Sequence, residues 1–355
     1  MFVYIILAVV IGFGASQETG TRSIRDYQLF YISLFLMFLV SGFRYWHGDY
    51  GTYEAGYNAG VDIGRDWGYY QIQLFGKALG FSFQLFVCLI TIFAIYAYKK
   101  AFSISLFPNF CLAVIMGKFF TFYAMSGTRQ FIAMAICWWA LKVLLKTQKI
   151  IPFIIMIAIA YTIHGSALIV VPVAFFYKRK FSYSITLFMI IIACIISFSS
   201  LAFFTSTTDF SDIANQRLSG YLTSSGNRET INVLNYFENL LFLLLALIAR
   251  KEAVKKIPYY DFFLYLFIIY YSFLIAGANI GIIKRLRDYY AIAYAFIIPG
   301  IFYLSKDKRI QNIIRLLFVV YFIFLFFRSL SIYDSAFKEN YYGRMVPYHS
   351  ILDMP

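Results

Sequence analysis

A succession of apolar runs along the whole chain constrains the fold more than any other feature of this sequence. A helix needs about 20 mainly apolar residues to cross the hydrocarbon core of a bilayer. Charged residues make up only 14% of the chain, whereas soluble domains hold about a quarter. The sequence therefore predicts an all-α polytopic membrane protein with about 12 transmembrane segments. The runs fall at about 1–15, 27–43, 81–98, 104–122, 130–145, 150–163, 165–177, 183–204, 231–249, 259–278, 289–304 and 310–328.

No repeat of fixed period and no low-complexity linker interrupts these runs, so we expect a single integral membrane domain over residues 1–355. The first run starts at Met1 without a basic stretch or a small-residue cleavage motif, and is expected to be a retained span. The longest connections, about 44–80, 205–230 and 329–355, are too short for a soluble catalytic domain.

The basic residues predict the topology. Six connections hold 16 basic residues against four acidic ones, and the opposite side holds 12 basic residues against 11 acidic ones. By the positive-inside rule the first side is cytoplasmic, and both termini then lie outside. The six cytoplasmic connections are 16–26, 99–103, 146–149, 178–182, 250–257 and 305–309.

The two sides also differ in the kind of basic residue. Eleven of the 16 cytoplasmic ones are lysines, whereas nine of the 12 outer ones are arginines. The planar guanidinium binds carboxylate or phosphate through two parallel hydrogen bonds, so an arginine-rich outer face predicts an anionic ligand there. In the alternative interpretation the arginines pair with neighbouring carboxylates or anchor helix ends. The outer arginines are Arg44, Arg65, Arg129, Arg217, Arg228, Arg285, Arg287, Arg328 and Arg344.

The stretch 150–177 predicts a short-helix hairpin. Basic residues flank it on both sides, and a single straight helix of this length would be about 42 Å long, too long for a ~30 Å core. Two short halves that turn at His164-Gly165 keep both basic ends in the cytoplasm. This places His164 at the outer ends of two helices.

Other chemistries find no support in the sequence. It contains no phosphate loop, no GxGxxG, no HExxH and no carboxylate pair typical of a metal-dependent nucleotide-sugar transferase. The four cysteines lie inside apolar runs and indicate neither disulfides nor a metal site. The net charge of +14 comes with cytoplasmic lysines, so it does not indicate nucleic-acid binding. We therefore expect no metal and no cofactor.

Several short motifs carry a resemblance to a known family. They are an arginine closing the second span, then Gly48-Asp49-Tyr50 with Tyr53, Ser126 to Gln130, His164-Gly165-Ser166-Ala167, Arg285 with Tyr289-Tyr290, and Val346-Pro347-Tyr348. In this order they resemble the EpsG/Wzy-type bacterial polysaccharide polymerases. The family pattern has Thr or Thr-Asp near the first glycine, whereas Trp46-His47 precede it here.

The resemblance implies a metal-independent glycosyltransferase of the bacterial cytoplasmic membrane, with its active site on the outer, periplasmic side. Such polymerases transfer a glycan from a polyprenyl pyrophosphate to another lipid-linked repeat unit, as in O-antigen, capsule or exopolysaccharide. The implied partners are these donor and acceptor lipids, membrane lipid and a chain-length regulator protein, with no nucleic acid and no cofactor.

We expect His164 to be the general base, because a neutral imidazole suits proton transfer near neutral pH. His47 lies in a loop and His349 in the tail, where we expect both side chains to be solvated. Asp49 is the rival; as an ion-pair partner of Arg44 it would instead orient the acceptor. Arg129 is expected to take part in catalysis. The expected pyrophosphate ligands are Arg44, Arg129, Arg285 and Arg287, and the expected substrate contacts are Tyr50, Tyr53, Gln130, Asp288 and Tyr289.

Two other functions remain open. An O-antigen ligase shares the overall plan, but it usually carries a long outer loop with a catalytic histidine, and the loop 205–230 has none. A flippase or transporter predicts charges at mid-bilayer and an internal repeat of spans, neither of which the sequence contains.

Overall fold

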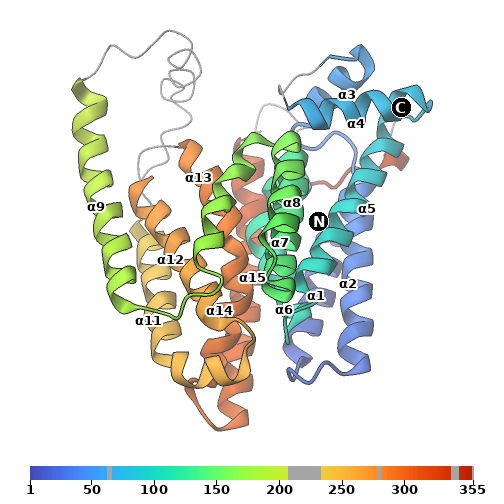
Figure 1. Cartoon of the computed structure of the whole chain (residues 1–355). Helices are drawn as coiled ribbons and strands as arrows, with labels where there is room; N and C mark the ends of the chain where they lie inside the picture. The colour runs from blue at the N-terminus through green and yellow to red at the C-terminus, as the bar shows by residue number, and fades with distance from the viewer. Residues whose placement is uncertain (62–65, 207–232, 278–280, 337–343, 354–355) are drawn as a thin grey trace. The chain divides into compact units, whose positions relative to one another are not determined.

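The computed structural model describes residues 1–61, 66–206, 233–277, 281–336 and 344–353. Within these ranges the chain is mostly helical, and the β-structure consists of one isolated bridge between Arg44 and Ser350 (Figure 1). The chain divides into two compact units. Unit 1 comprises Met1–Val171 with Ser305–Pro355, and unit 2 comprises Pro172–Leu304.

Unit 1 is centred on α7 (Thr128–Thr147), which packs against α5 (Phe83–Phe102) and α8 (Ile150–Ile163). Most residues of α7 are buried, because it is apolar around most of its circumference. Its other helices are α1 (Phe2–Gln17), α2 (Ile24–Gly42), α3 (Tyr50–Ala59), α4 (Trp67–Ala78), α6 (Pro108–Ile115), the π-helix η1 (Met116–Ala124) and α15 (Lys308–Ala336), and the 3₁₀-helix η2 (Gly165–Phe175) begins in this unit.

Two close contacts hold helices of unit 1 together. A Cβ at Gly117 in η1 would lie 2.7 Å from the Phe322 carbonyl oxygen, so the absence of a side chain allows η1 to approach α15 closely. The buried Glu18 carboxylate accepts hydrogen bonds from the backbone N–H groups of Asn109 (2.6 Å) and Phe110 (2.9 Å), which satisfies the start of α6. Burial raises the pKa of Glu18 to about 8, against the opposing effect of these bonds.

Unit 2 is organised around α12 (Tyr260–Ala276), whose side chains are almost all buried. This helix packs against α9 (Tyr183–Ser206), α11 (Val233–Lys256) and the 3₁₀-helix η3 (Asp288–Ala293). Arg250 and Asp261 join α11 to α12 by two hydrogen bonds of 2.7 and 2.8 Å. The unit also contains α13 (Gly281–Arg287), α14 (Tyr294–Ile301) and η4 (Phe302–Leu304).

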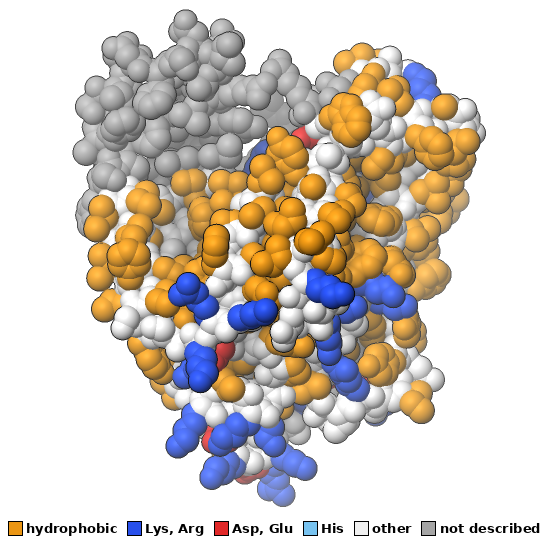
Figure 2. Space-filling model, in the orientation of Figure 1, with side chains coloured by type: hydrophobic (Ala, Val, Ile, Leu, Met, Phe, Trp, Pro, Cys, Tyr) orange, Lys and Arg blue, Asp and Glu red, His pale blue; other side chains and the backbone are white. Residues whose placement is uncertain are grey.

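The surface agrees with the membrane prediction. Hydrophobic side chains cover much of the face in Figure 2. Exposed large apolar residues such as Phe35 (58%) and Ile151 (73%) would be costly in water and suit contact with lipid. Five of the described helices, α2, α5, α7, α11 and α15, are long and apolar enough to cross a membrane. The protein is therefore an all-helical membrane protein in its described part, and the count of 12 spans remains a prediction.

Two local predictions meet the structure differently. The break at His164-Gly165 is confirmed, because α8 ends at Ile163, His164 is extended and η2 begins at Gly165. The loop 44–80 is wrong as a loop, since it contains α3 and α4. Likewise α15 continues to Ala336 inside the expected tail 329–355, and most of the loop 205–230 lies outside the described residues.

Candidate functional site

A carboxylate at the start of α4 links two helices of unit 1. Asp66 is the N-cap residue of α4, and its Oδ2 atom lies 2.6 Å from Nη1 of Arg129, in the first turn of α7. The two side chains are 13% and 22% exposed. A charge-assisted bond in this partly buried setting holds the guanidinium in a defined orientation.

The same carboxylate oxygen faces His164. Nδ1 of His164 lies 3.9 Å from Asp66 Oδ2, too far for a hydrogen bond but close enough for an ion pair once the imidazole is protonated. His164 caps the C-terminus of α8, where a positive charge is favoured. The two residues approach because α4 packs on α8 at Gly68, where a Cβ would overlap the Thr162 side chain.

Tyr53 of α3 completes the surroundings of Arg129. The guanidinium carbon lies 5.4 Å from the centroid of the Tyr53 ring, and Nε donates a 3.3 Å hydrogen bond to the phenol oxygen. Burial raises the pKa of Tyr53, against the lowering effect of Arg129, so the phenol is neutral near neutral pH. Asp66, Arg129, His164 and Tyr53 are called the arginine cluster below.

Arg44 supplies a second guanidinium behind this cluster. Its side chain is 2% exposed, and Nη2 donates a 2.7 Å hydrogen bond to Oγ1 of Thr128, the residue before Arg129. Nη1 donates to the Ser41 carbonyl oxygen, while Nε has no hydrogen-bond partner among the described residues. Burial lowers the pKa of Arg44, but a guanidinium keeps its proton in proteins. The site thus holds a buried positive charge that no described carboxylate neutralises.

The expected ion pair between Arg44 and Asp49 is wrong. Arg44 points inward to Thr128, whereas Asp49 is exposed at the start of α3. The chain turns between them at Gly48, whose φ of +58° is a left-handed conformation that suits glycine. This turn sends the two side chains in different directions, although only five positions separate them.

His47 is also placed differently from the expectation of a solvated loop histidine. It is fully buried, its Nδ1 lies 2.6 Å from the Arg344 carbonyl oxygen, and the His349 N–H donates to its Nε2 at 3.1 Å. Since Nε2 accepts, we infer that Nδ1 carries the proton. Burial lowers the pKa of His47 to about 4, so the neutral ring joins the C-terminal segment to the loop before α3.

Two other predicted substrate contacts are buried. Tyr50 is 2% exposed and donates a 2.9 Å hydrogen bond to Gln84 Oε1, and Gln130 in α7 is 4% exposed. In this structure neither side chain presents a substantial accessible surface. Their contact with substrate stays a prediction.

The remaining predicted site residues form a separate group in unit 2. Nε of Arg287 lies 3.4 Å from Asp288 Oδ1, and the Arg287 guanidinium carbon lies 5.0 Å from the Tyr270 ring centroid. Asp288 is 6% exposed and Tyr289 fully buried, while Arg285 is exposed. The structure thus groups Arg287 with Asp288 in unit 2, as it groups Arg129 with His164 in unit 1.

Sequence reasoning assigned no role to Asp66. The signal that would have found it is its position: an Asp directly before Trp67 fits the N-cap of a helix. Without α4, the residue is one carboxylate among several in a long loop. The role of Thr128 was also missed, since a threonine at a helix start usually reads as a cap.

The chemistry available here is that of cations and a base. Two guanidinium groups can neutralise an anion, and an imidazole beside a carboxylate can take up a proton. No group of three or more metal-ligating side chains gathers within the described ranges. The absence of a metal from the reaction remains a prediction.

The cluster lies inside a family match that covers nearly the whole chain. The EpsG family model matches residues 27–350, which include Arg44, Tyr53, Asp66, Arg129 and His164. No curated protein and no solved structure matches the chain. By the extent of this match, the chain belongs to the EpsG family.

Proposed function

We propose that this protein is a membrane glycosyltransferase that polymerises oligosaccharide repeat units carried on polyprenyl pyrophosphate. The reaction takes place on the outer face of the bacterial cytoplasmic membrane and needs no metal ion. Membership of the EpsG family supports a polysaccharide polymerase in general. The observation that carries the specific reaction is the buried guanidinium of Arg44 directly behind the arginine cluster.

In this proposal the donor pyrophosphate binds at the start of α7. Arg129 presents its guanidinium there, and the uncompensated charge of Arg44 adds to the positive potential. Cations held in place before the reaction stabilise the charge that builds on a leaving pyrophosphate, because no reorganisation is needed in the transition state. Within unit 2, Arg285 and Arg287 are proposed as phosphate ligands.

His164 is proposed to take the proton of the acceptor hydroxyl. The acceptor oxygen forms a bond to the anomeric carbon, the bond from that carbon to the pyrophosphate oxygen breaks, and polyprenyl pyrophosphate leaves with the electron pair. Asp66, 3.9 Å from Nδ1, stabilises the imidazolium that forms. Asp49 remains the rival base, because it is exposed and not held by Arg44.

The test is polymer formation by the purified full-length protein in detergent or nanodiscs. Incubation with a lipid-linked repeat unit should give a ladder of products, and a chelator should leave the ladder unchanged. A single addition to a lipid A-type acceptor without a ladder would indicate a ligase. Movement of the lipid across vesicles without any new glycosidic bond would indicate a flippase.

The base is tested by comparing His164→Ala with Asp49→Asn, and donor binding is measured separately for each variant. We expect His164→Ala to bind the donor and lose turnover. An active His164→Ala beside an inactive, donor-binding Asp49→Asn would move the base to Asp49.

A further inference from the structure

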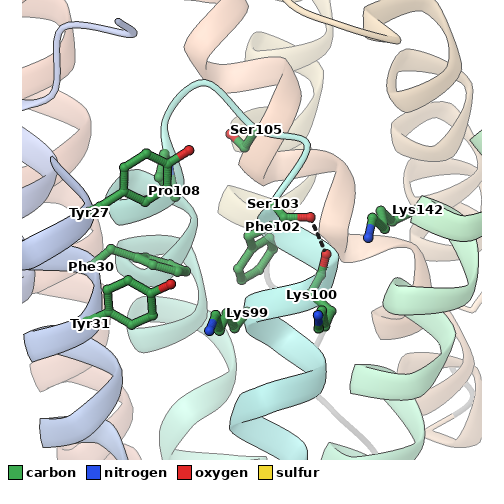
Figure 3. Close-up of a pocket in the computed structure, with 10 residues that line it drawn as sticks. All are labelled: Tyr27, Phe30, Tyr31, Lys99, Lys100, Phe102, Ser103, Ser105, Pro108 and Lys142. Carbon is green, nitrogen blue, oxygen red and sulfur yellow. Dashed lines mark hydrogen bonds between the residues drawn. The ribbon is translucent and has the colours of Figure 1, made fainter. Parts of the chain in front are cut away.

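A basic cavity lies in unit 1 near the end of α5. None of its lining residues belongs to the arginine cluster. It has a volume of about 180 Å³ and lies between α2, α5, the start of α6 and α7 (Figure 3). Three aromatic residues of α2 stand on one side, and Lys142 of α7 stands on the other. The lining residues are Tyr27, Phe30, Tyr31, Lys99, Lys100, Phe102, Ser103, Ser105, Pro108 and Lys142.

The charge in this cavity is uncompensated. Three of the ten lining residues are lysines, and none is Asp or Glu. The lysine side chains are half-buried, and within the described part of the chain none of the three forms an ion pair. Like charges held together away from bulk water repel one another, so an anion bound among them would be stabilising.

Hydrogen bonds from Arg22 and Ser103 hold one wall of the cavity, the turn after α5, in place. The Arg22 guanidinium donates to the Ser105 carbonyl oxygen at 3.0 and 3.2 Å and to the Ser103 carbonyl oxygen at 3.2 Å. The Ser103 hydroxyl donates to the Lys100 carbonyl oxygen at 2.7 Å. These bonds fix the turn after α5, and Arg22 adds a fourth positive charge behind it.

The surroundings of the cavity favour a lipid over a soluble anion. Tyr27 and Tyr31 on its wall are 40% and 49% exposed, and Lys99 Nζ lies 4.7 Å from the Tyr31 ring centroid. The same helix exposes Ile32 (50%) and Phe35 (58%), which suit contact with acyl chains. Tyrosines are typical of the interface, where headgroups lie. A phosphate in the cavity can therefore keep its attached tail along α2.

We propose that this lysine cavity binds the phosphate of an anionic phospholipid from the cytoplasmic leaflet. The lysine-rich connections are assigned to the cytoplasm by the positive-inside rule, and basic pockets between helices on that side suit anionic headgroups. The proposal does not depend on the polymerase reaction, because no cavity residue belongs to the arginine cluster.

The test measures lipid retention by native mass spectrometry on the full-length protein, with phosphatidylglycerol against phosphatidylcholine. The variant replaces Lys99, Lys100 and Lys142 by Gln. The control replaces Lys251, Lys255 and Lys256 by Gln, which removes the same charge from α11 outside the cavity. We expect wild type and control to prefer phosphatidylglycerol, and the cavity variant to bind it at least ~10-fold more weakly.

Two further arms decide the outcome. A variant with Arg at all three lysine positions should retain the lipid, which separates loss of charge from loss of folding. Excess inorganic phosphate should not displace phosphatidylglycerol; if it competes at equal concentration, the cavity takes free phosphate and the lipid proposal is wrong. Equal loss in the α11 control, or unchanged retention in the cavity variant, also overturns it.

Discussion

The two ends of α7 carry positive charge in contrasting ways. At its start, Arg129 is bonded to Asp66 and Tyr53, and Arg44 is buried beside it. Near its end, Lys142 lines a cavity with two other lysines and no carboxylate. A helix of 20 residues is about 30 Å long, so these ends are separated by about the thickness of a hydrocarbon core. At the start of α7, the proposed pyrophosphate site holds its guanidinium groups in a fixed orientation. Near the end, the proposed lipid cavity attracts a phosphate by charge alone.

The largest expected effect is at the start of α7. Arg129→Lys should lower polymer formation by about 100-fold, because an ammonium cannot bond Asp66 and Tyr53 while presenting a planar fork to phosphate. The measurement is the initial rate of ladder formation by purified protein. A variant that inserts normally and polymerises at the wild-type rate would reduce Arg129 to an anchor.

Arg44 is expected to have a smaller effect on rate and little effect on stability. Arg44→Gln removes a buried charge without an ionic partner, so the cost of desolvating that charge disappears with its hydrogen bonds. We expect donor binding about 10-fold weaker, worth about 1.4 kcal/mol, with the unfolding temperature within about 4 °C of wild type. Strong destabilisation with normal donor binding would make Arg44 a structural residue.

The long helices and the break at His164-Gly165 were predictable from the sequence, whereas two short helices were not. The apolar runs predicted the long helices because a membrane span needs a long apolar stretch, and His164-Gly165 marked a true break. Neither α3 nor α4 was predicted, since helices of 10 and 12 residues are too short to give the long apolar run expected of a membrane span. Asp66 was consequently given no role in the site.

Contacts between distant parts of the chain were the other source of error. We expected His47 to be solvated. The residues that bury it are Arg344 and His349, which follow about 300 positions later. The Arg44–Asp49 pair was inferred from nearness in sequence, which does not give the direction of a side chain. Both errors concern tertiary contacts that a local pattern does not encode.

The attachment of the C-terminal segment should depend on pH through His47. Its pKa is lowered from 6.5 to about 4 in the folded state, so the unfolded state binds the proton more readily between these values. The stabilisation is complete above pH 6.5 and falls by at most roughly 3 kcal/mol as pH drops toward 4. Proteolysis of the segment, or thermal unfolding, between pH 7 and 4 measures this loss.

The matched variant is His47→Gln, which keeps a polar side chain but cannot titrate. We expect it to be less stable at pH 7 and to lack this part of the pH dependence. The same slope in wild type and variant would assign the effect to other groups.

The smallest effect is expected at the lysine end of α7. Lys142→Arg should change polymer formation by less than about twofold, because a half-buried cation without a fixed partner tolerates another cation. The assay is the one used for Arg129→Lys. A loss as large as in that variant would remove the contrast between the two ends.

The central claim is that the arginine cluster faces the outside of the cell and the lysine end faces the cytoplasm. Cysteines placed singly at Gly165, beside His164, and at Thr147, the last residue of α7, test it directly, since both positions are exposed. In intact spheroplasts a membrane-impermeant thiol reagent should label position 165, and it should reach position 147 only after permeabilisation. Labelling of the wild-type protein, which has four cysteines, gives the background. Labelling of position 147 from outside, with position 165 protected, would contradict the account.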